Sequence, residues 1–356
     1  MDNQKAGIYR YTKEVLDALH RLNSEEFTIY LLRHVKDDKY PNFKHLVIPR
    51  YRRFIGWATL MVFFANPWLA IRNKIDIVIE PAHFGPFNLP KRIKRVTIIH
   101  DLTPIKFPKY HTLRGSYLQK LFLPGIIKKA DRLFTNSDWT KKDLIEVYPA
   151  AKGKSETIYL GLSKKFVHAE NKKLLRSEHL VYRDYILYVG TIEPRKNLTF
   201  LLKSFAEFKA KYKSDLQLVI AGKKGWKSEK FYDLLKTNTV FRDVRMLGFV
   251  PNSHLNLLYS GASLFIYPSL YEGFGFPPLE AMVCGTKALV PENSSISEVC
   301  KGLAYFYDTN DPKEMADIIH DCLEDSFDPK SNIEKIRAKF NWDNYAVQFL
   351  NRLKEL

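Results

Sequence analysis

Short apolar runs alternate with longer amphipathic segments along the whole chain. The apolar runs have the length and the β-branched content of buried strands, and the segments after them have apolar residues at helical spacing. The strands that we expect cover residues 27–32, 75–79, 95–99, 132–135 and 156–159, and then 185–189, 217–221, 244–247, 263–267 and 287–290. Strands that alternate with helices form parallel sheets covered by helices on both faces. The pattern therefore predicts an α/β protein with two doubly wound parallel sheets.

The length and the polar breaks divide this pattern into two domains. The chain has 356 residues, of which 46% are hydrophobic, enough for two cores of ordinary size. Residues 171–183 carry little apolar periodicity and are the expected linker between domains 1–170 and 184–339, and residues 340–356 are expected to form a closing helix. Because such sheets bind ligands at the carboxyl ends of their strands, we expect a ligand cleft between the two domains.

The segment that says most about chemistry, residues 271–282, reads Tyr-Glu-Gly-Phe-Gly-Phe-Pro-Pro-Leu-Glu-Ala-Met. Paired prolines suit the first turn of a helix, and Gly273 and Gly275 let the backbone approach a ligand closely. Free amides at a helix start favour phosphate, whereas Glu272 and Glu280 can accept hydrogen bonds from hydroxyl groups. A ligand with both phosphate and several hydroxyl groups is a nucleotide sugar, so the segment predicts a nucleotide-sugar site. The alternative interpretation is a structural strand-to-helix turn that needs glycine and carries surface glutamates.

A second candidate follows the strand at 185–189, where Gly190 is succeeded by Arg195 and Lys196. A planar guanidinium fork beside a mobile ammonium suits a diphosphate, and fixed cations stabilise the charge that builds on a departing nucleoside diphosphate. The alternative is a solvated pair of surface cations. In the first domain, His100 and Asp101 end the strand at 95–99; His100 could bind a sugar hydroxyl there, or be a structural histidine. Asp101 could act as a base or hold the loop.

Basic residues are concentrated in the first half, because residues 1–180 hold 33 of the 56 Lys and Arg but 17 of the 39 Asp and Glu. Nucleic acid, an anionic membrane or a phosphorylated substrate would each account for this excess. Residues 54–68 are rich in aromatics, too short to span a bilayer and flanked by basic residues, so we interpret them as a membrane-surface segment. A core helix with a solvated basic face is the alternative. The chain has no helix-turn-helix, zinc-finger or RNA-binding pattern, which argues against nucleic acid.

Other classes are disfavoured by missing motifs. Cys284, Cys300 and Cys322 have neither zinc-site nor disulfide-framework spacing, and we find no signal peptide and no membrane-spanning run. The sequence has no Asp-x-Asp triplet to hold a divalent metal on a diphosphate, and no phosphate-binding loop of ATPases, dinucleotide fingerprint or nucleophile elbow. We therefore expect a cytoplasmic protein that uses neither a metal nor a cofactor.

Taken in order, these motifs resemble glycosyltransferase family 4, also called group 1, whose members are retaining enzymes of the GT-B fold. The similarity covers nearly the whole chain: residues 7–12, His100-Asp101, residues 130–132 with Asn136-Ser137, residues 190–197, 218–222, 248–251 and 272–280, and Phe340-x-Trp342. Two of these segments, 190–197 and 221–226, are similar to bacterial enzymes that build O-antigen or capsule chains, many of them mannosyltransferases.

The resemblance implies a role for each matching position. Arg195 and Lys196 would hold the donor diphosphate, Glu280 the ribose and Glu272 the donor sugar, while His100 would touch that sugar from the acceptor side. His100, Glu272, Arg195 and Lys196 are thus the expected catalytic residues. The expected donor-binding residues are Gly7, Gly190, Arg195, Lys196, Gly248, Phe249, Val250, Glu272, Gly273, Phe274, Gly275, Phe276 and Glu280, and those on the acceptor side are His100, Asp101 and Ser137.

The same resemblance gives the expected reaction. A hexose, with mannose from GDP-mannose preferred, would pass to a lipid-linked saccharide at the inner face of the cytoplasmic membrane, with the leaving phosphate helping to deprotonate the acceptor. The alternatives are a UDP-sugar-dependent hexosyl- or N-acetylhexosaminyltransferase, a nucleotide-sugar epimerase and an inactive sugar-nucleotide-binding protein. The residues leave the acceptor, the linkage and the oligomeric state open.

One departure concerns the start of the chain. Family members usually have an apolar strand ahead of the glycine loop, whereas six mostly polar residues precede Gly7. We therefore expect a truncated start or a rearranged first sheet, with weakened donor binding at Gly7.

Overall fold

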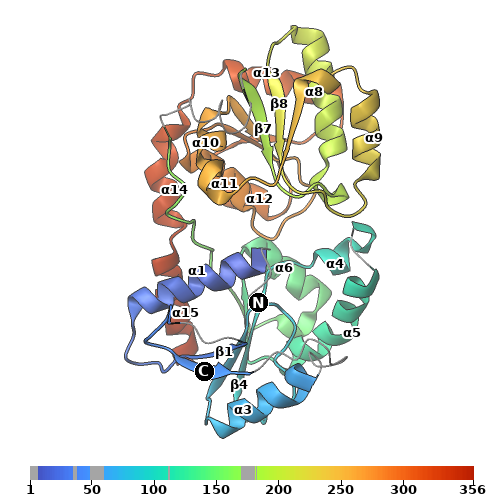
Figure 1. The fold of residues 1–356 in the computed structure, drawn as a ribbon. Helices are drawn as coiled ribbons and strands as arrows, with labels where there is room; N and C mark the ends of the chain where they lie inside the picture. Colours follow the sequence, from blue (N-terminus) through green and yellow to red (C-terminus); the bar gives the residue numbers. More distant parts are fainter. Residues whose placement is uncertain (1–6, 35–37, 49–59, 111–112, 170–180, 182) are drawn as a thin grey trace. The chain divides into compact units, whose positions relative to one another are not determined.

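The computed structural model describes residues 7–34, 38–48, 60–110, 113–169, 181 and 183–356, which fall into two compact units (Figure 1). The first unit comprises Met1–Leu102, Arg114–Gly161 and Asn341–Leu356, and the second comprises Thr103–Leu113 and Leu162–Phe340. Three segments thus belong to a different unit from the one expected by their position in the chain. Residues 103–110 and 162–169 join the second unit, and the closing helix joins the first.

Parallel strands form the centre of the first unit. Four strands pair in the order β3-β4-β5-β6, and β1 pairs with β2 in a separate parallel ribbon. The strands are β1 Tyr30–Arg33, β2 Lys44–Val47, β3 Ile77–Glu80, β4 Lys94–Ile99, β5 Arg132–Thr135 and β6 Ser155–Thr157. The helices are α1 Gly7–Leu22, the π-helix η1 Met61–Ala65, α3 Asn66–Arg72, α5 Leu113–Lys129, α6 Asp138–Val147, the 3₁₀ turn η3 Pro149–Ala151 and α15 Trp342–Lys354.

The core of this unit lies between β4, β5 and the helices α5 and α6, where Ile99, Ile127, Leu133 and Leu144 are fully buried. Asn341 caps α15 by accepting a hydrogen bond from the backbone N–H of Asp343 at 2.8 Å. The apolar face of α15 then packs against α1, and the two helices share a buried hydroxyl contact of 2.5 Å between Tyr11 and Tyr345. The last helix therefore closes the first unit.

The second unit is built on six parallel strands in the order β12-β11-β10-β7-β8-β9. The strands are β7 Tyr185–Val189, β8 Gln217–Ala221, β9 Val244–Gly248, β10 Leu264–Ile266, β11 Ala288–Pro291 and β12 Tyr305–Tyr307. The α-helices are α4 Thr103–Lys106, α8 Leu198–Tyr212, α9 Glu229–Thr237, α10 Asn252–Gly261, α11 Phe276–Val283, α12 Ser294–Val299, α13 Pro312–Glu324 and α14 Ile333–Lys339. Short 3₁₀ turns are η2 Pro108–Tyr110, η4 Pro194–Lys196, η5 Phe241–Asp243 and η6 Pro329–Asn332.

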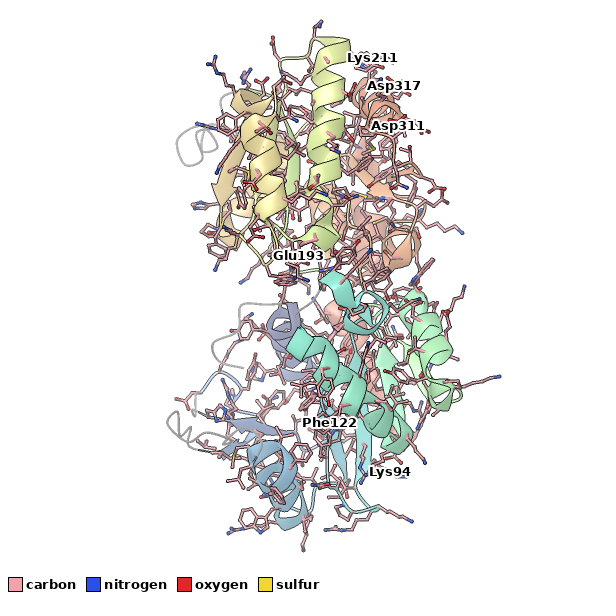
Figure 2. The ribbon with its side chains drawn as sticks, turned by 90° about the vertical axis from the view of Figure 1, so that its right-hand side faces the viewer. Lys94, Phe122, Glu193, Lys211, Asp311 and Asp317 are labelled. Carbon is pink, nitrogen blue, oxygen red and sulfur yellow. The ribbon has the colours of Figure 1, made fainter. Side chains whose placement is uncertain are left out.

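Helices cover this sheet in two layers. In one layer α8 lies between α9 and α13, and in the other α11 packs against α10 and α14 (Figure 1). Lys211 of α8 and Asp317 of α13 form an exposed ion pair of 2.5 Å (Figure 2). The strand order β10-β7-β8 makes β7 and β10 parallel neighbours, so their carboxyl ends lie next to each other and position the candidate site described below.

The predicted α/β architecture with parallel sheets is confirmed, and all ten predicted strands are present with small shifts at their ends. Strands β2 and β12 were missed. The β2 residues Lys-His-Leu-Val are mixed in polarity and half exposed, and β12 has three residues, so neither carries the buried apolar run on which the predictions relied. The predicted linker falls largely outside the described residues, as do residues 1–6 and 54–59.

Gly7 differs from the expected glycine loop. It is the first residue of α1, and a Cβ added to it would meet no atom within 4 Å among the described residues. Donor binding at Gly7 stays a prediction.

Candidate active site

The loop after β7 is built by two unusual backbone conformations. Gly190 has φ of +155°, and a Cβ there would lie 2.6 Å from the hydroxyl of Tyr188, so glycine is required. The turn η4 then carries Arg195 and Lys196 and ends at Asn197, whose left-handed conformation at φ of 55° begins α8. The N–H of Leu270 donates to the carbonyl of Arg195 at 2.9 Å, so this loop is tied to the end of β10.

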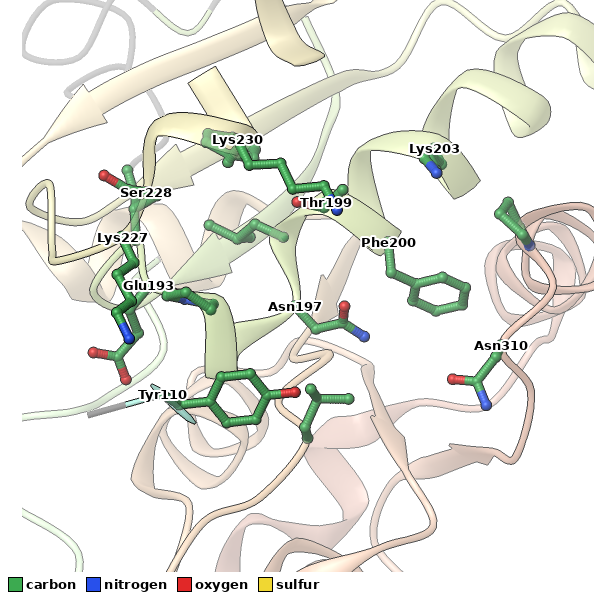
Figure 3. A pocket seen from close by; sticks show the side chains of 16 residues that line it. Tyr110, Glu193, Asn197, Thr199, Phe200, Lys203, Lys227, Ser228, Lys230 and Asn310 are labelled. Carbon is green, nitrogen blue, oxygen red and sulfur yellow. The ribbon is translucent and has the colours of Figure 1, made fainter. Parts of the chain in front are cut away.

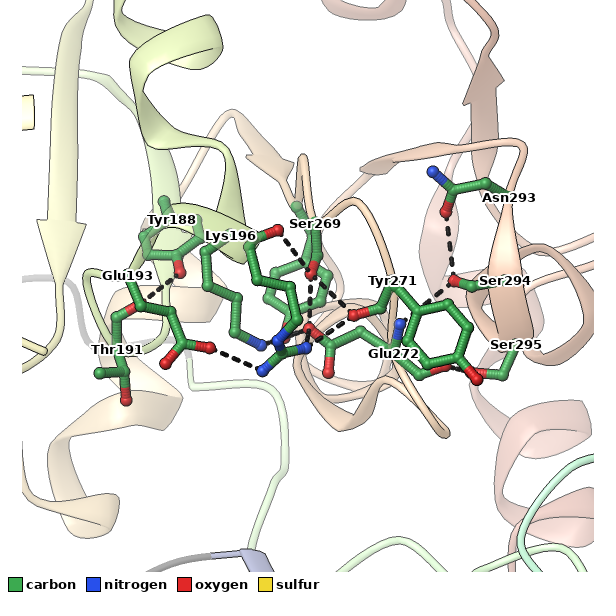
Figure 4. A network of polar contacts seen from close by, with 12 residues as sticks. Tyr188, Thr191, Glu193, Lys196, Ser269, Tyr271, Glu272, Asn293, Ser294 and Ser295 are labelled. Atoms are coloured by element: carbon green, nitrogen blue, oxygen red, sulfur yellow. Dashed lines mark hydrogen bonds and ion pairs between the residues drawn. The ribbon is translucent and has the colours of Figure 1, made fainter. Parts of the chain in front are cut away.

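Glu272 lies at the centre of a buried polar cluster, which contains Arg195, Lys196 and the side chains around them (Figure 4). Its Oε1 accepts hydrogen bonds from the Lys196 ammonium, from Ser269 Oγ at 2.6 Å and from Tyr267 Oη at 3.2 Å. Arg195 Nη1 lies 2.8 Å from the same oxygen. Burial by itself would raise the pKa of Glu272, but Lys196 and Arg195 stabilise the carboxylate and lower the pKa to about 2. Glu272 is therefore ionised at neutral pH.

Arg195 is held by a second carboxylate. Its Nη2 lies 2.7 Å from Oε1 of Glu193, and its Nη1 donates to the carbonyl of Tyr271 at 2.6 Å. The Glu193 side chain is 2% exposed, and burial raises its pKa despite the neighbouring cations. Two cations thus face two carboxylates, which balances most of the charge of the cluster before any ligand binds.

Lys196 is buried, with 7% of its surface exposed, and burial lowers its pKa although Glu272 favours the charged form. Its ammonium donates to Tyr267 Oη at 2.6 Å and to Glu272. An ammonium has three N–H donors, so one has no partner among the residues that the structure describes. The cluster can therefore offer an oriented N–H to an anionic ligand.

The backbone of the glycine segment is fixed from α12. Ser295 Oγ donates to the carbonyl of Glu272 at 2.7 Å, and the N–H of Glu272 faces Ser294 Oγ at 3.4 Å. Gly275 has φ of +90° and precedes α11, whose first turn contains the paired prolines as predicted. Glu280 is on α11 and buried, and its Oε2 accepts a hydrogen bond from Tyr259 Oη at 3.0 Å. Gly273, Phe274 and Phe276 lie in the same segment.

The loop predicted to hold the base follows β9. Gly248 has φ of +65°, and its carbonyl accepts from the N–H of Gly222 at 2.7 Å. Phe249 is 53% exposed, and the Lys223 ammonium lies 4.5 Å from the centre of its ring, whereas Val250 is buried. An exposed ring beside a lysine is a surface on which a base could stack. Base binding here stays a prediction.

A cavity of about 470 Å³ borders η4 (Figure 3). Its lining includes Glu193 and Asn197, together with Lys203, Lys227 and Lys230. Tyr110 of the turn η2 lines the cavity, and its carbonyl accepts from Trp226 Nε1 at 2.5 Å. Lysines and the beginnings of α8 and α9 give this cavity walls that favour anions.

The acceptor-side predictions fall in the first unit. His100 follows β4, and its Nε2 donates to the carbonyl of Pro81 at 2.7 Å. Burial, together with repulsion from His83, lowers the pKa of His100 to about 4, so the ring is neutral and its Nδ1 is an acceptor. The hydrogen bond to Pro81 and then the charge of Asp101 raise the pKa of His100 against these effects. Ser137 is fully buried and caps α6, where its Oγ accepts from the N–H of Thr140 at 3.1 Å. The predicted contact of Ser137 with an acceptor stays a prediction.

The structure thus brings together Arg195, Lys196 and Glu272, as the sequence predicted from two separate motifs. It adds residues that the sequence reasoning missed: Glu193, Tyr267, Ser269, Ser294 and Ser295. Glu193 stood inside a quoted motif, but a glutamate beside Pro-Arg-Lys gives no sign of its burial. In the described part of the chain, no three His, Cys, Asp or Glu side chains gather as they would around a metal.

Comparison with known sequences decides the family. Residues 172–340 match the sequence family described as Glycosyl transferases group 1, and residues 6–165 match Glycosyltransferase Family 4. The chain is 32% identical over 296 residues to the O-antigen chain mannosyltransferase B of Escherichia coli, a match that covers 81% of this chain and 76% of that protein. The chain belongs to glycosyltransferase family 4.

This family 4 glycosyltransferase is also similar to the O-antigen chain mannosyltransferase RfbU of Salmonella typhimurium, with 26% identity over 98% of this chain and 96% of that one. Its fold is similar to that of HepE of Anabaena, solved in complex with UDP-glucose, with a TM-score of 0.73 and 16% identity over 99% of this chain and 97% of that one. The glycosyltransferase therefore has the GT-B fold, with two Rossmann-like units.

Proposed function

We propose that this glycosyltransferase moves a hexose, mannose from GDP-mannose, to a saccharide during the synthesis of a bacterial surface polysaccharide. The observation that carries the proposal is the buried cluster of Arg195, Lys196 and Glu272 at neighbouring strand ends. The choice of mannose is supported by the mannosyltransferase names of the relatives.

The cluster suits departure of a nucleoside diphosphate. Charge develops on the phosphate oxygen as its bond to the sugar carbon breaks, and the Lys196 ammonium and the Arg195 guanidinium are already oriented, so little reorganisation opposes the reaction. Glu272 remains ionised and can accept hydrogen bonds from sugar hydroxyls. We propose a retaining reaction, in which the acceptor oxygen bonds to the sugar carbon on the face that the phosphate leaves and gives its proton to that phosphate.

The test is transfer from GDP-mannose to octyl α-mannoside, with UDP-glucose, UDP-galactose and UDP-N-acetylglucosamine as competing donors. The anomeric configuration of the product, read by NMR from the coupling at the anomeric centre, should be that of the donor sugar.

We also propose that no divalent metal takes part. Removal of a catalytic metal would abolish the charge stabilisation that it supplies. Because the proposed reaction uses none, kcat in EDTA should stay within about twofold of its value with Mg²⁺. A loss of turnover in EDTA that Mg²⁺ or Mn²⁺ restores would contradict this part.

We further propose that the first unit binds an anionic membrane surface, where a lipid-linked acceptor would be found. No helix in the described residues is long and apolar enough to cross a membrane. Exposed apolar side chains are present on η1, α3 and α5, and the ring centres of Phe63 and Phe122 lie 5.8 Å apart, which places η1 beside α5. The exposed residues, which we call the apolar patch, are Leu60, Phe64, Trp68, Ile71, Tyr117, Leu118 and Leu121.

The exposure of these residues argues against the alternative of a core helix. Phe64 is 64% exposed, Trp68 54% and Tyr117 66%. Arg72 lies 5.0 Å from the centre of the Trp68 ring, and Lys120 is exposed between the apolar residues of α5. Aromatic side chains beside cations suit the interface of an anionic bilayer.

Replacing Phe64 and Trp68 together by serine is expected to lower the fraction bound to phosphatidylglycerol vesicles at low salt by about tenfold, because two aromatic anchors are lost. Phe241, which is 50% exposed in the second unit, is the matched control, and Phe241→Ser should leave binding unchanged. Vesicle sedimentation measures both variants. Equal retention of wild type on phosphatidylglycerol and phosphatidylcholine vesicles would remove the membrane proposal.

A further inference from the structure

Two histidines and a glutamine form a second polar group, in the first unit. His83 follows β3 and His100 follows β4, the neighbouring strand, so both lie at the carboxyl edge of the sheet. Their ring centres are 6.2 Å apart. Gln119 comes from α5, and its amide nitrogen lies 2.8 Å from Nε2 of His83. Neither His83 nor Gln119 was predicted to be functional.

The pair of His83 and Gln119 has unused hydrogen-bonding capacity. Nδ1 of His83 and Oε1 of Gln119 are both buried, and neither has a hydrogen-bond partner among the residues that the structure describes. Buried polar atoms are nearly always hydrogen-bonded, and an unmet one costs free energy, so each such atom needs an explanation. A bound polar group would supply the missing partners.

The chemistry of the pair defines that group. The Gln119 amide nitrogen donates to Nε2 of His83, so the neutral ring carries its proton on Nδ1, which is a donor, while Oε1 of Gln119 is an acceptor. Reversing the amide exchanges these two roles and again leaves one donor and one acceptor. Burial lowers the pKa of His83, which keeps the ring neutral. Because the two ring nitrogens point in different directions, two hydroxyl groups of one ligand, one at Nδ1 of His83 and one at Oε1 of Gln119, would satisfy both atoms.

The surrounding structure holds the pair rigidly. His83 has φ of 48°, an uncommon conformation for a residue other than glycine, of the kind that functional sites retain. Phe84, next to it, stacks edge-on against Phe87 and Phe122 at 5.3 Å each, and Phe122 is on α5 with Gln119 (Figure 2). Thr97 Oγ1 donates to the carbonyl of Gly85 at 2.8 Å and so ties the loop to β4.

We propose that His83 and Gln119 each bind a hydroxyl group of the saccharide acceptor, next to His100. This inference rests on the proposed function, because it names the acceptor contact of the same transferase. Gln119 shares α5 with Tyr117 and Leu121 of the apolar patch, so a saccharide bound here would lie near the surface proposed to meet the membrane. The site thus suits a saccharide that is attached to a lipid.

The test measures transfer from GDP-mannose to octyl α-mannoside by His83→Phe and Gln119→Leu, which remove the polar atoms at similar volume. We expect KM for octyl α-mannoside to rise about tenfold or more in each variant, the effect of one lost hydrogen bond at a buried site. The dissociation constant for GDP, from calorimetry, should stay within about twofold of the wild-type value, since the nucleotide site is in the second unit. Lys129→Ala, at an exposed position in the last turn of α5, is the matched control, and its KM should be that of wild type.

Deoxygenated acceptors make the test specific. The 2-, 3-, 4- and 6-deoxy forms of octyl α-mannoside each lack one hydroxyl. With wild type, kcat/KM for one of these forms should be about tenfold lower than for octyl α-mannoside. With Gln119→Leu, kcat/KM for that form and for octyl α-mannoside should be equal. If every deoxy acceptor loses as much kcat/KM with the two variants as with wild type, no hydroxyl group is bound by the pair. That result, or an unchanged acceptor KM, would mean that the pair holds only water and that the inference is wrong. A melting temperature for each variant separates this result from misfolding. Absence of any transfer by wild type, with no calorimetric binding of GDP or UDP, would instead overturn the proposed function and this inference with it.

Discussion

Replacement of Lys196 by methionine is expected to lower kcat for sugar transfer by about 10²- to 10³-fold, the range for loss of one preorganised charge-stabilising donor. The ammonium is buried and fixed by Tyr267 and Glu272, and its third N–H, which has no partner among the described residues, is the donor that we propose for the departing phosphate. Methionine keeps the length of the side chain and removes its charge. Steady-state kinetics with GDP-mannose and octyl α-mannoside measure the change.

Two further variants separate catalysis from stability. Lys196→Met leaves the buried Glu272 carboxylate with one cation fewer, which costs stability. Adding Glu272→Gln should recover the melting temperature but not kcat. Lys211→Met is the matched control, because the ion pair of Lys211 with Asp317 is exposed and worth little, and its kcat should be that of wild type. If Lys196→Met lowers the melting temperature but keeps the wild-type kcat, Lys196 only stabilises Glu272 and takes no part in catalysis.

Replacement of Gly222 by alanine is expected to lower the free energy of unfolding of the second unit by about 3 kcal/mol, the upper range for overpacking. Gly222 follows β8, and a Cβ there would overlap the carbonyl oxygen of Gly190, a backbone atom that cannot rotate away. The loop that carries Arg195 and Lys196 would have to shift. Urea unfolding and GDP calorimetry should therefore both report a loss.

Gly248→Ala is the matched control for this substitution. Gly248 also ends a strand of the same sheet, and a Cβ there would meet no atom within 4 Å among the described residues. Only the cost of a left-handed conformation remains, about 1 kcal/mol. If Gly222→Ala is no more destabilising than Gly248→Ala, the two loops are not packed as closely as the structure has them.

The balanced charge of the cluster explains why replacing Lys196 should cost far more stability than replacing an exposed residue such as Lys211. Arg195 and Lys196 face Glu193 and Glu272, and every member is mostly buried. Removing one member of such a network leaves a buried charge without compensation, which costs far more than breaking an exposed pair. The same balance holds the two cations in place in the structure.

The parallel sheets could be predicted because their strands are buried on both faces and thus appear as continuous apolar runs, such as residues 185–189 and 217–221. The edge strand β12 lacks that signal, and β2 pairs outside the larger sheet. The meeting of Lys196 with Glu272 could also be anticipated in part, since both follow parallel strands. Their contact depends on β7 and β10 being neighbours, an order that local pattern does not contain.

Side-chain environments were harder to predict. Ser137 matched a family motif, but its hydroxyl is used to cap α6. Phe64 and Trp68 belong to a segment whose composition fits a core as well as a surface, and only packing decides which side chains are covered. His83 and Gln119 are 36 residues apart and carry no motif, so their pairing follows from the packing of α5 against the loop after β3.

By itself the sequence determined the alternation of strands and helices, the membership in glycosyltransferase family 4 and the two motifs of the candidate site, because these depend on residue order and local conformation. The tertiary structure alone decided that Glu193 and Glu272 neutralise the cations, that the apolar patch is exposed, and that His83 and Gln119 leave a donor and an acceptor unmet. Burial and hydrogen-bond partners arise from segments distant in the chain, and it is these that set the charge and the binding capacity of a side chain.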